Sequence, residues 1–284
     1  MIETVLDRTD VIALRVDIAG ITYHVDSAAP KSLAIPLRFN GPQPNFFGAS
    51  RAQANPLQGA GFIGDTQQGG SCNVAEIRMV PHCNGTHTES VGHIVHAEHA
   101  VFESLPQSLM AAVVISVTPV STSDTDDACR PTPDHGDALI THDALETELS
   151  GYAQDELTAL IVRTLPNDAA KKATEYGDLY RPPYFSADAM RYLVERGVQH
   201  LLVDIPSIDK MHDDGRLTNH HIFWNVPEGT HEATHDMWLT RTVTEMIFVD
   251  DSIGDGLYLL NLQLPAFHSD AAPCRPVVYA LNPE

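Results

Sequence analysis

The chain has few basic residues, few cysteines and no long apolar run. Its 17 lysines and arginines are outnumbered by 38 aspartates and glutamates, which gives a formal net charge of −21 at pH 7. That charge argues against nucleic acid and against anionic membrane surfaces as partners. No stretch approaches the roughly 18 apolar residues that a membrane-spanning helix needs. We therefore expect a small-molecule substrate, and further copies of the chain, as partners.

The chain holds four cysteines, too few for a disulfide scaffold in 284 residues. Its first seven residues lack the basic start and the apolar stretch of a signal peptide. We therefore expect a cytoplasmic protein. Because 43% of the residues are hydrophobic, the chain can bury a large core. It contains no internal repeat and no clear linker, so we expect a single domain over residues 1–284.

Side chains that bind metals or transfer protons are concentrated between residues 83 and 93. Cys83, His87, Glu89 and His93 lie within eleven residues, and His82 directly precedes them. Nitrogen, sulfur and carboxylate donors together suit zinc or another divalent transition metal. An open coordination position on such a metal would hold an activated water. The segment therefore predicts a metal-dependent hydrolase.

The same segment resembles the metal-dependent cyclase superfamily, which includes bacterial kynurenine formamidase and isatin hydrolase. The family pattern is His-x-Gly-Thr-His-x-Asp-x-Pro-x-His, and its Gly-Thr-His core matches residues 85–87. The resemblance implies that Cys83, His87 and Glu89 bind metal. It also implies that His93, which matches the last histidine of the pattern, is the general acid/base.

The chain departs from the family pattern at three positions. Cys83 replaces a histidine, Glu89 replaces an aspartate and Val91 replaces a proline. Because soft thiolate ligands select softer metals, Cys83 favours Zn²⁺, with Mn²⁺ as the alternative. His82 is the alternative ligand to Cys83 if the loop is shifted by one residue.

A second region supports the resemblance. Residues 201–209 resemble the family segment GxDxxSxD, which precedes a pair of histidines, here residues 220–221. The family places a glutamate on a later strand, and Glu245 is the candidate. The resemblance implies that His220 and Glu245 help to bind one or two metal ions. If there are two, Glu89 is the natural bridging carboxylate.

The resemblance also implies a fold and a reaction. The family fold is a swivelling β/β/α arrangement, which is an α/β fold with a mixed sheet, and family members often form dimers or larger assemblies such as tetramers. The expected reaction is hydrolysis of an amide-type C–N bond other than a peptide bond, as in an aryl formamide or a lactam. Cyclisation or dehydration is the alternative within the family. Phe46 and Phe47 are expected in a substrate-facing loop, and core packing is an equal alternative for them.

Apolar alternation and β-branched runs predict many short strands. Ser186, which precedes a periodic run that ends near Gly197, predicts a capped helix over residues 187–196. Residues 53–70 are predicted to be a loop and residues 121–136 a surface excursion. The predicted strands are residues 11–18, 21–25, 75–80, 109–117, 159–165, 200–205, 242–249, 256–262 and 276–281.

A competing motif lies further along the chain. His231-Glu232-Ala233-Thr234-His235 matches the zinc-protease signature, in which two histidines one helical turn apart bind zinc and the glutamate is the base. That motif requires an uninterrupted helix, whereas Pro227 and Gly229 lie just upstream. A histidine-rich surface loop is the simpler interpretation of this segment.

A metal-binding protein without catalytic activity is the alternative from another functional class. A Cys83 thiolate could complete a closed structural zinc site. His93 argues for catalysis instead, because a structural site needs no additional proton carrier. Asp204 and Asp209 are candidates to orient metal ligands, although aspartates at strand ends are as often caps or turn residues.

Overall fold

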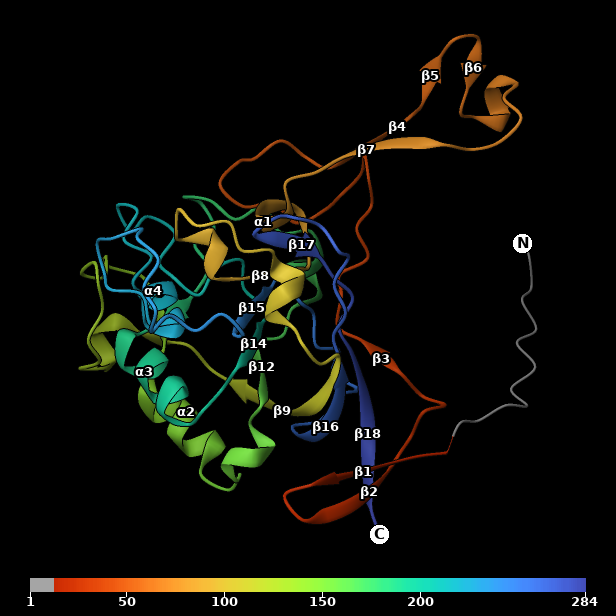
Figure 1. Ribbon diagram of the computed structural model, residues 1–284. Helices are drawn as coiled ribbons and strands as arrows, with labels where there is room; N and C mark the ends of the chain where they lie inside the picture. The colour runs from red at the N-terminus through yellow and green to blue at the C-terminus, as the bar shows by residue number, and fades with distance from the viewer. Residues whose placement is uncertain (1–12) are drawn as a thin grey trace.

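A large mixed β-sheet forms the centre of the computed structural model, which describes residues 13–284 (Figure 1). Four parallel strands lie in its middle: β9 (Leu109–Val117), β12 (Ala159–Thr164), β14 (His200–Val203) and β15 (Thr242–Glu245). The other strands of this sheet are β1 (Leu14–Ile18), β2 (Ile21–Val25), β3 (Lys31–Ser32), β8 (His87–Glu89), β16 (Gly256–Asn261), β17 (Ala271–Pro273) and β18 (Val277–Pro283). Their order is β1-β2-β18-β16-β9-β12-β14-β15-β8-β17, and β3 pairs with β18. The prediction of an α/β fold with a mixed sheet is confirmed.

The central strands bury both of their faces. Successive side chains of a strand point to opposite sides, so each strand contributes to two apolar layers. On β12, Leu160 and Val162 pack into the layer that includes the helices, whereas Ala159 and Ile161 pack into the opposite layer. A strand buried on both faces has a nearly continuous apolar sequence, which is why β9 and β12 were predicted correctly.

Helices cover the first of these layers, as Figure 1 shows for α2 and α3. The helix α3 (Ala187–Glu195) begins as predicted, since the Ser186 side chain accepts a hydrogen bond from the Ala189 backbone N–H. The helices α2 (His142–Leu149) and α4 (Thr218–Trp224) were not predicted from the sequence. The remaining helix, α1 (Pro81–Asn84), is a single turn. The 3₁₀ turns are η1 (Thr66–Gln68), η2 (Val91–His93), η3 (Val101–Ser104), η4 (Thr122–Asp124), η5 (Gln154–Glu156) and η6 (Ala169–Ala173).

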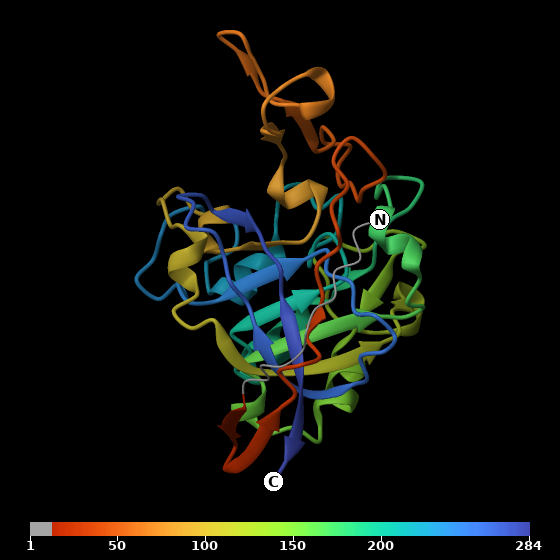
Figure 2. The ribbon, with the colours of Figure 1, turned by 90° about the vertical axis from the view of Figure 1, so that its right-hand side faces the viewer.

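An arm of paired strands projects from the body (Figures 1 and 2). It consists of β4 (Gln53–Pro56), β5 (Gln58–Gly59), β6 (Phe62–Ile63) and β7 (Ala75–Arg78). The prediction of a loop over residues 53–70 is therefore wrong. Ala60 and Gly61 between β5 and β6 both have positive φ, the geometry of a tight two-residue hairpin turn. A glycine-rich composition conceals such short strands.

Other predicted elements agree with the structure apart from their ends. The hairpin of β1 and β2 turns at Ala19 and Gly20 as expected, although residues 11 and 12 of its first predicted strand lie outside the described residues. Residues 121–136 begin with the end of β10 (Val120–Ser121) and with η4, and are irregular from there to β11 (Ala138–Ile140), which pairs with β13 (Tyr184–Phe185). Within residues 13–284, none of the helices has the length and apolar character needed to cross a bilayer.

His200, at the start of β14, predicts how stability responds to pH. Burial, followed by the charge of Arg241, lowers the pKa of His200 to about 4 from 6.5. Between these values the unfolded chain binds a proton that the folded chain excludes, so stability falls as the pH drops below 6.5. His200 should therefore lower the unfolding free energy by about 2 kcal/mol between pH 7 and pH 5.

Urea denaturation of the wild type and of His200→Gln at both pH values measures this contribution. The loss of unfolding free energy from pH 7 to pH 5 should be smaller by about 2 kcal/mol in His200→Gln. An equal loss in both proteins would show that His200 does not control the acid response.

Candidate metal centre

Strand β8 places two of the predicted ligands opposite a third. It runs antiparallel between β15 and β17, and its register pairs His87 with Glu245. Because residues two apart on a strand point to the same face, His87 and Glu89 project together beside Glu245. All three side chains are almost completely buried. The strand pairing alone therefore assembles a histidine and two carboxylates in the protein interior.

Helix α4 adds His220 to this group. The His220 Nε2 atom lies 2.7 Å from Glu89 Oε1, and its Nδ1 atom lies 2.6 Å from Asp209 Oδ2. Asp209 also accepts a hydrogen bond from the Asn219 backbone N–H in the first turn of α4. Asp209 therefore holds both the helix and the histidine ring. That it thereby orients a metal ligand stays a prediction. Asp204, the other aspartate considered, pairs with Lys171 and Thr164 instead.

The single turn α1 directs His82, rather than Cys83, toward Glu89. The His82 Nδ1 atom lies 2.9 Å from Glu89 Oε2. Neighbouring residues on a helix point about 100° apart, and the half-buried Cys83 packs against the cluster of Phe46, Tyr176 and Met211. Burial, followed by the charge of Glu245, raises the pKa of the Cys83 thiol, which disfavours a thiolate. Of the two alternatives for the first ligand, the geometry favours His82.

Two groups of ligand atoms share Glu89. One consists of His87, Glu89 and Glu245, and the other of His82, Glu89 and His93. Within each group the ligand atoms lie within 4.8 Å of one another. A carboxylate has two oxygens and can contact two ions at once. The arrangement is therefore compatible with one or two divalent ions, with Glu89 between them.

His87 shows most directly that the residues present fit a cation. Its Nδ1 atom lies 2.9 Å from the Gly85 carbonyl oxygen and donates to it, which leaves the Nε2 lone pair free. The Nε2 atom is buried without a hydrogen-bond partner among the described residues, and it lies 3.5 Å from Glu245 Oε2. Neither atom carries a proton to donate when the carboxylate is ionised. A cation between them would satisfy both.

Burial and neighbouring charges shift the pKa values of Glu245, Glu89 and His220. Burial raises the pKa of Glu245, and the neighbouring Glu89 charge raises it further. Burial alone would also raise the pKa of Glu89, but the charges of His93 and His220 outweigh it and lower that pKa well below its usual range. Burial would lower the pKa of His220, yet Glu89 and Asp209 together raise it well above its usual value. Glu89 and Glu245 have carboxylate oxygens within 4.8 Å of each other, and two buried carboxylates this close require positive charge nearby.

His93 lies at the edge of the centre, where a proton carrier was predicted. Its Nε2 atom is 3.9 Å from Glu89 Oε2, and its Nδ1 atom is 3.3 Å from Asp270 Oδ2. Asp270 also accepts from His82 Nε2 at 2.8 Å. Hydrogen bonds from these two histidines lower the pKa of Asp270 well below its usual range. Asp270 was not predicted from the sequence, because it is 177 residues from His93 and lies outside any matched motif.

Phe46 and Phe47 occupy different environments on one loop. Phe46 is buried, and its backbone N–H donates to the Cys83 carbonyl oxygen, so core packing accounts for it. Phe47 is 58% exposed and has a φ of 55°, in the left-handed region that residues other than glycine rarely adopt. Its ring lies edge-on to His212 at 6.4 Å. A substrate contact by either residue stays a prediction.

The zinc-protease segment forms no helix. Residues 231–234 are irregular and 235–236 form a turn. His231 Nδ1 lies 2.8 Å from the Ile94 carbonyl oxygen, whereas His235 is exposed beside Asp236. Because the segment is not helical, the two histidines are not placed one helical turn apart, as the motif requires. The zinc-protease interpretation therefore fails, and the surface-loop interpretation agrees with the structure.

Comparisons with known sequences relate the chain to one enzyme family. A family model described as "Putative cyclase" matches residues 21–210. Kynurenine formamidase from Bacillus cereus (strain ZK / E33L) is 30% identical over 132 residues, which are 46% of this chain and 54% of that protein. The Bacillus mycoides kynurenine formamidase is 28% identical over 131 residues, with the same coverage. The chain thus spans about half the length of the curated relatives that it matches.

Solved structures share the fold over most of the chain. A predicted metal-dependent hydrolase from Bacillus stearothermophilus has a TM-score of 0.56 and 16% identity, and the match covers 88% of this chain and 98% of that one. Isatin hydrolase A from Labrenzia aggregata has a TM-score of 0.57 and 14% identity, with 89% and 93% coverage. At this level of identity the likeness shows the fold alone.

Replacing Glu89 tests whether the two ligand groups bind metal. Glu89→Gln keeps the side-chain shape but removes the charge and one acceptor oxygen that both groups share. We expect Zn²⁺ affinity, measured by titration calorimetry, to fall at least tenfold. Glu103→Gln, which changes an exposed carboxylate outside both groups, is the matched control and should bind Zn²⁺ normally. Equal affinity in all three proteins would show that the metal lies elsewhere.

Proposed function

This chain belongs to the cyclase family, and on that premise we propose that it is a metal-dependent hydrolase of amide-type C–N bonds other than peptide bonds. The observation that carries the proposal is the Glu89 carboxylate, buried between two groups of ligand atoms. The names of its relatives point to an aryl formamide or an aryl-fused lactam as the substrate class. Both substrates place a hydrolysable C–N bond beside an aromatic ring.

We assign the metal site to His87, Glu89, His220 and Glu245, together with His82. When bound, a divalent ion polarises an acyl oxygen and lowers the pKa of a coordinated water. The set of imidazole and carboxylate donors suits Zn²⁺, and Mn²⁺ is the alternative. Asp209 orients His220, because its carboxylate accepts a hydrogen bond from Nδ1–H and leaves Nε2 directed at Glu89.

His93 is the residue that moves the proton. Hydrolysis adds hydroxyl to the acyl carbon and a proton to the departing nitrogen, so a group beside the metal must accept one proton and return one. His93 is partly exposed, with its Nε2 atom 3.9 Å from Glu89 Oε2. An imidazole whose pKa is ordinarily near 6.5 can perform both transfers at neutral pH. This position suits a proton carrier better than a purely structural role.

Phe47 is our candidate for a contact with an aromatic substrate. It is exposed, whereas its neighbour Phe46 packs against the cluster that includes Cys83. Residues held in sparsely populated backbone regions, as Phe47 is, cluster at active sites and ligand-binding sites. We further propose a homo-oligomer, as the family resemblance implies, and a cytoplasmic location.

Two histidine variants separate proton transfer from metal binding. In His93→Ala, kcat on a panel of aryl formamides and aryl-fused lactams should fall by roughly 10²–10⁴-fold while the metal content is kept. In His87→Ala, both activity and metal content should fall. Elemental analysis of the same preparations gives the metal content. Full activity in His93→Ala would remove His93 from the mechanism.

A further inference from the structure

We propose that Asp270 is a positioning residue, which uses one carboxylate oxygen to orient His82 and His93 toward Glu89. The inference rests on the proposed function, since it concerns how His93 is held for proton transfer. Asp270 directly precedes β17, and its backbone carbonyl oxygen accepts from the Ser90 N–H at 3.0 Å. The residue is thereby fixed against the strand that carries Glu89.

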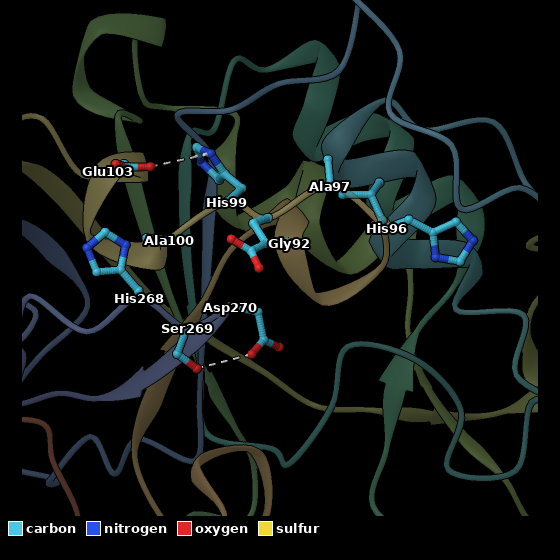
Figure 3. A pocket seen from close by; sticks show the side chains of 11 residues that line it. Gly92, His96, Ala97, His99, Ala100, Glu103, His268, Ser269 and Asp270 are labelled. Carbon is cyan, nitrogen blue, oxygen red and sulfur yellow. Dashed lines mark hydrogen bonds and ion pairs between the residues drawn. The ribbon is translucent and has the colours of Figure 1, made fainter.

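Asp270 lies between the histidines and a solvent cavity. The cavity has a volume of about 420 Å³, and Gly92, His99, His268 and Asp270 are among its lining residues (Figure 3). The Asp270 side chain is 37% exposed, and its second oxygen accepts from Ser269 Oγ at 3.3 Å. One oxygen of the carboxylate therefore contacts the two histidines, while the other bonds to Ser269 beside the cavity.

The two histidines connect Asp270 to Glu89. Their rings are stacked with centroids 4.2 Å apart. The same Asp270 oxygen, Oδ2, is 2.8 Å from His82 Nε2 and 3.3 Å from His93 Nδ1. The opposite ring nitrogens, His82 Nδ1 and His93 Nε2, lie 2.9 Å and 3.9 Å from Glu89 Oε2. Each imidazole thus has one nitrogen toward Asp270 and the other toward the metal centre.

This geometry selects one tautomer of each ring. An ionised carboxylate only accepts hydrogen bonds, so the nitrogens that face Asp270 must carry hydrogen. Glu89 is also a carboxylate, so this holds for the metal-loaded protein, in which a cation would take the place of ring hydrogens at Glu89. In the neutral rings the lone pairs would then lie on His82 Nδ1 and His93 Nε2, the atoms that face Glu89. A lone pair at His82 Nδ1 can bind metal, and one at His93 Nε2 can accept a proton. Without Asp270, nothing would favour hydrogen on His93 Nδ1. The opposite tautomer would then form, and its lone pair would lie on Nδ1, away from the centre.

The tautomer of His93 is the direct readout. In ¹⁵N-histidine-labelled, Zn²⁺-loaded protein, long-range ¹H–¹⁵N correlation spectra at alkaline pH distinguish Nδ1–H from Nε2–H, and His93→Gln identifies the His93 signals. We expect Nδ1–H in the wild type and in Asp270→Glu, and a mixture or Nε2–H in Asp270→Ala. His268→Ala, which alters the same cavity without touching either ring, should retain the wild-type tautomer.

Kinetics at saturating Zn²⁺ provide the second readout. Asp270→Ala should lower kcat about 10- to 100-fold with little change in KM, and Asp270→Glu should restore part of the loss. His268→Ala should remain at the wild-type rate. A wild-type tautomer in Asp270→Ala, or an unchanged kcat in a folded variant, would overturn the proposal.

The two readouts separate this inference from the proposed function. If the wild type hydrolyses none of the substrates, the proposed function fails, and the tautomer in Asp270→Ala still decides whether Asp270 positions His93. If the wild type is active and the tautomer does not change, only the role of Asp270 fails.

Discussion

The Glu89 side chain is 1% exposed, and its carboxylate contacts His82 and His220 at hydrogen-bonding distance. An isolated ionised carboxylate in an apolar interior costs many kcal/mol, so such a group persists only with compensating positive charge. Three separate segments, α1, η2 and α4, bring histidines to Glu89, and a cation bound among them would supply that charge. Glu245, a second buried carboxylate, increases the demand for positive charge. The arrangement of the centre follows from this electrostatic requirement.

The mixed sheet meets this requirement by combining parallel and antiparallel pairing at one edge. The parallel strands end with β15, and β8 then pairs with β15 in the opposite direction, which places His87 beside Glu245. On the far side of β8, β17 pairs with it directly after Asp270. His87, Glu245 and Asp270, which are far apart in the sequence, are thereby brought to one edge of the sheet. The apolar layers on both faces of β12 keep these strand ends in place.

The sequence identified the candidate ligands that lie together better than it predicted their surroundings. His87, Glu89, His220 and Glu245 were found from motif order, and the structure brings all four together. The choice between His82 and Cys83 depends on the direction of one helical turn, which spacing alone does not determine. Asp270 was missed because it reaches His93 only through the pairing of β17 with β8. Helix α4 was missed because its seven residues are too few to show a helical repeat.

Anomalous X-ray diffraction from crystals grown with Zn²⁺ shows whether Glu89 binds metal, because it locates the ion without reference to activity. We expect an anomalous peak roughly 2.0–2.2 Å from a Glu89 oxygen, and a His87 Nε2 atom at about the same distance from a zinc ion. A second peak on the side of His82 would show that Glu89 bridges two ions. Zinc bound elsewhere, with no peak beside Glu89 at saturating Zn²⁺, would contradict the account.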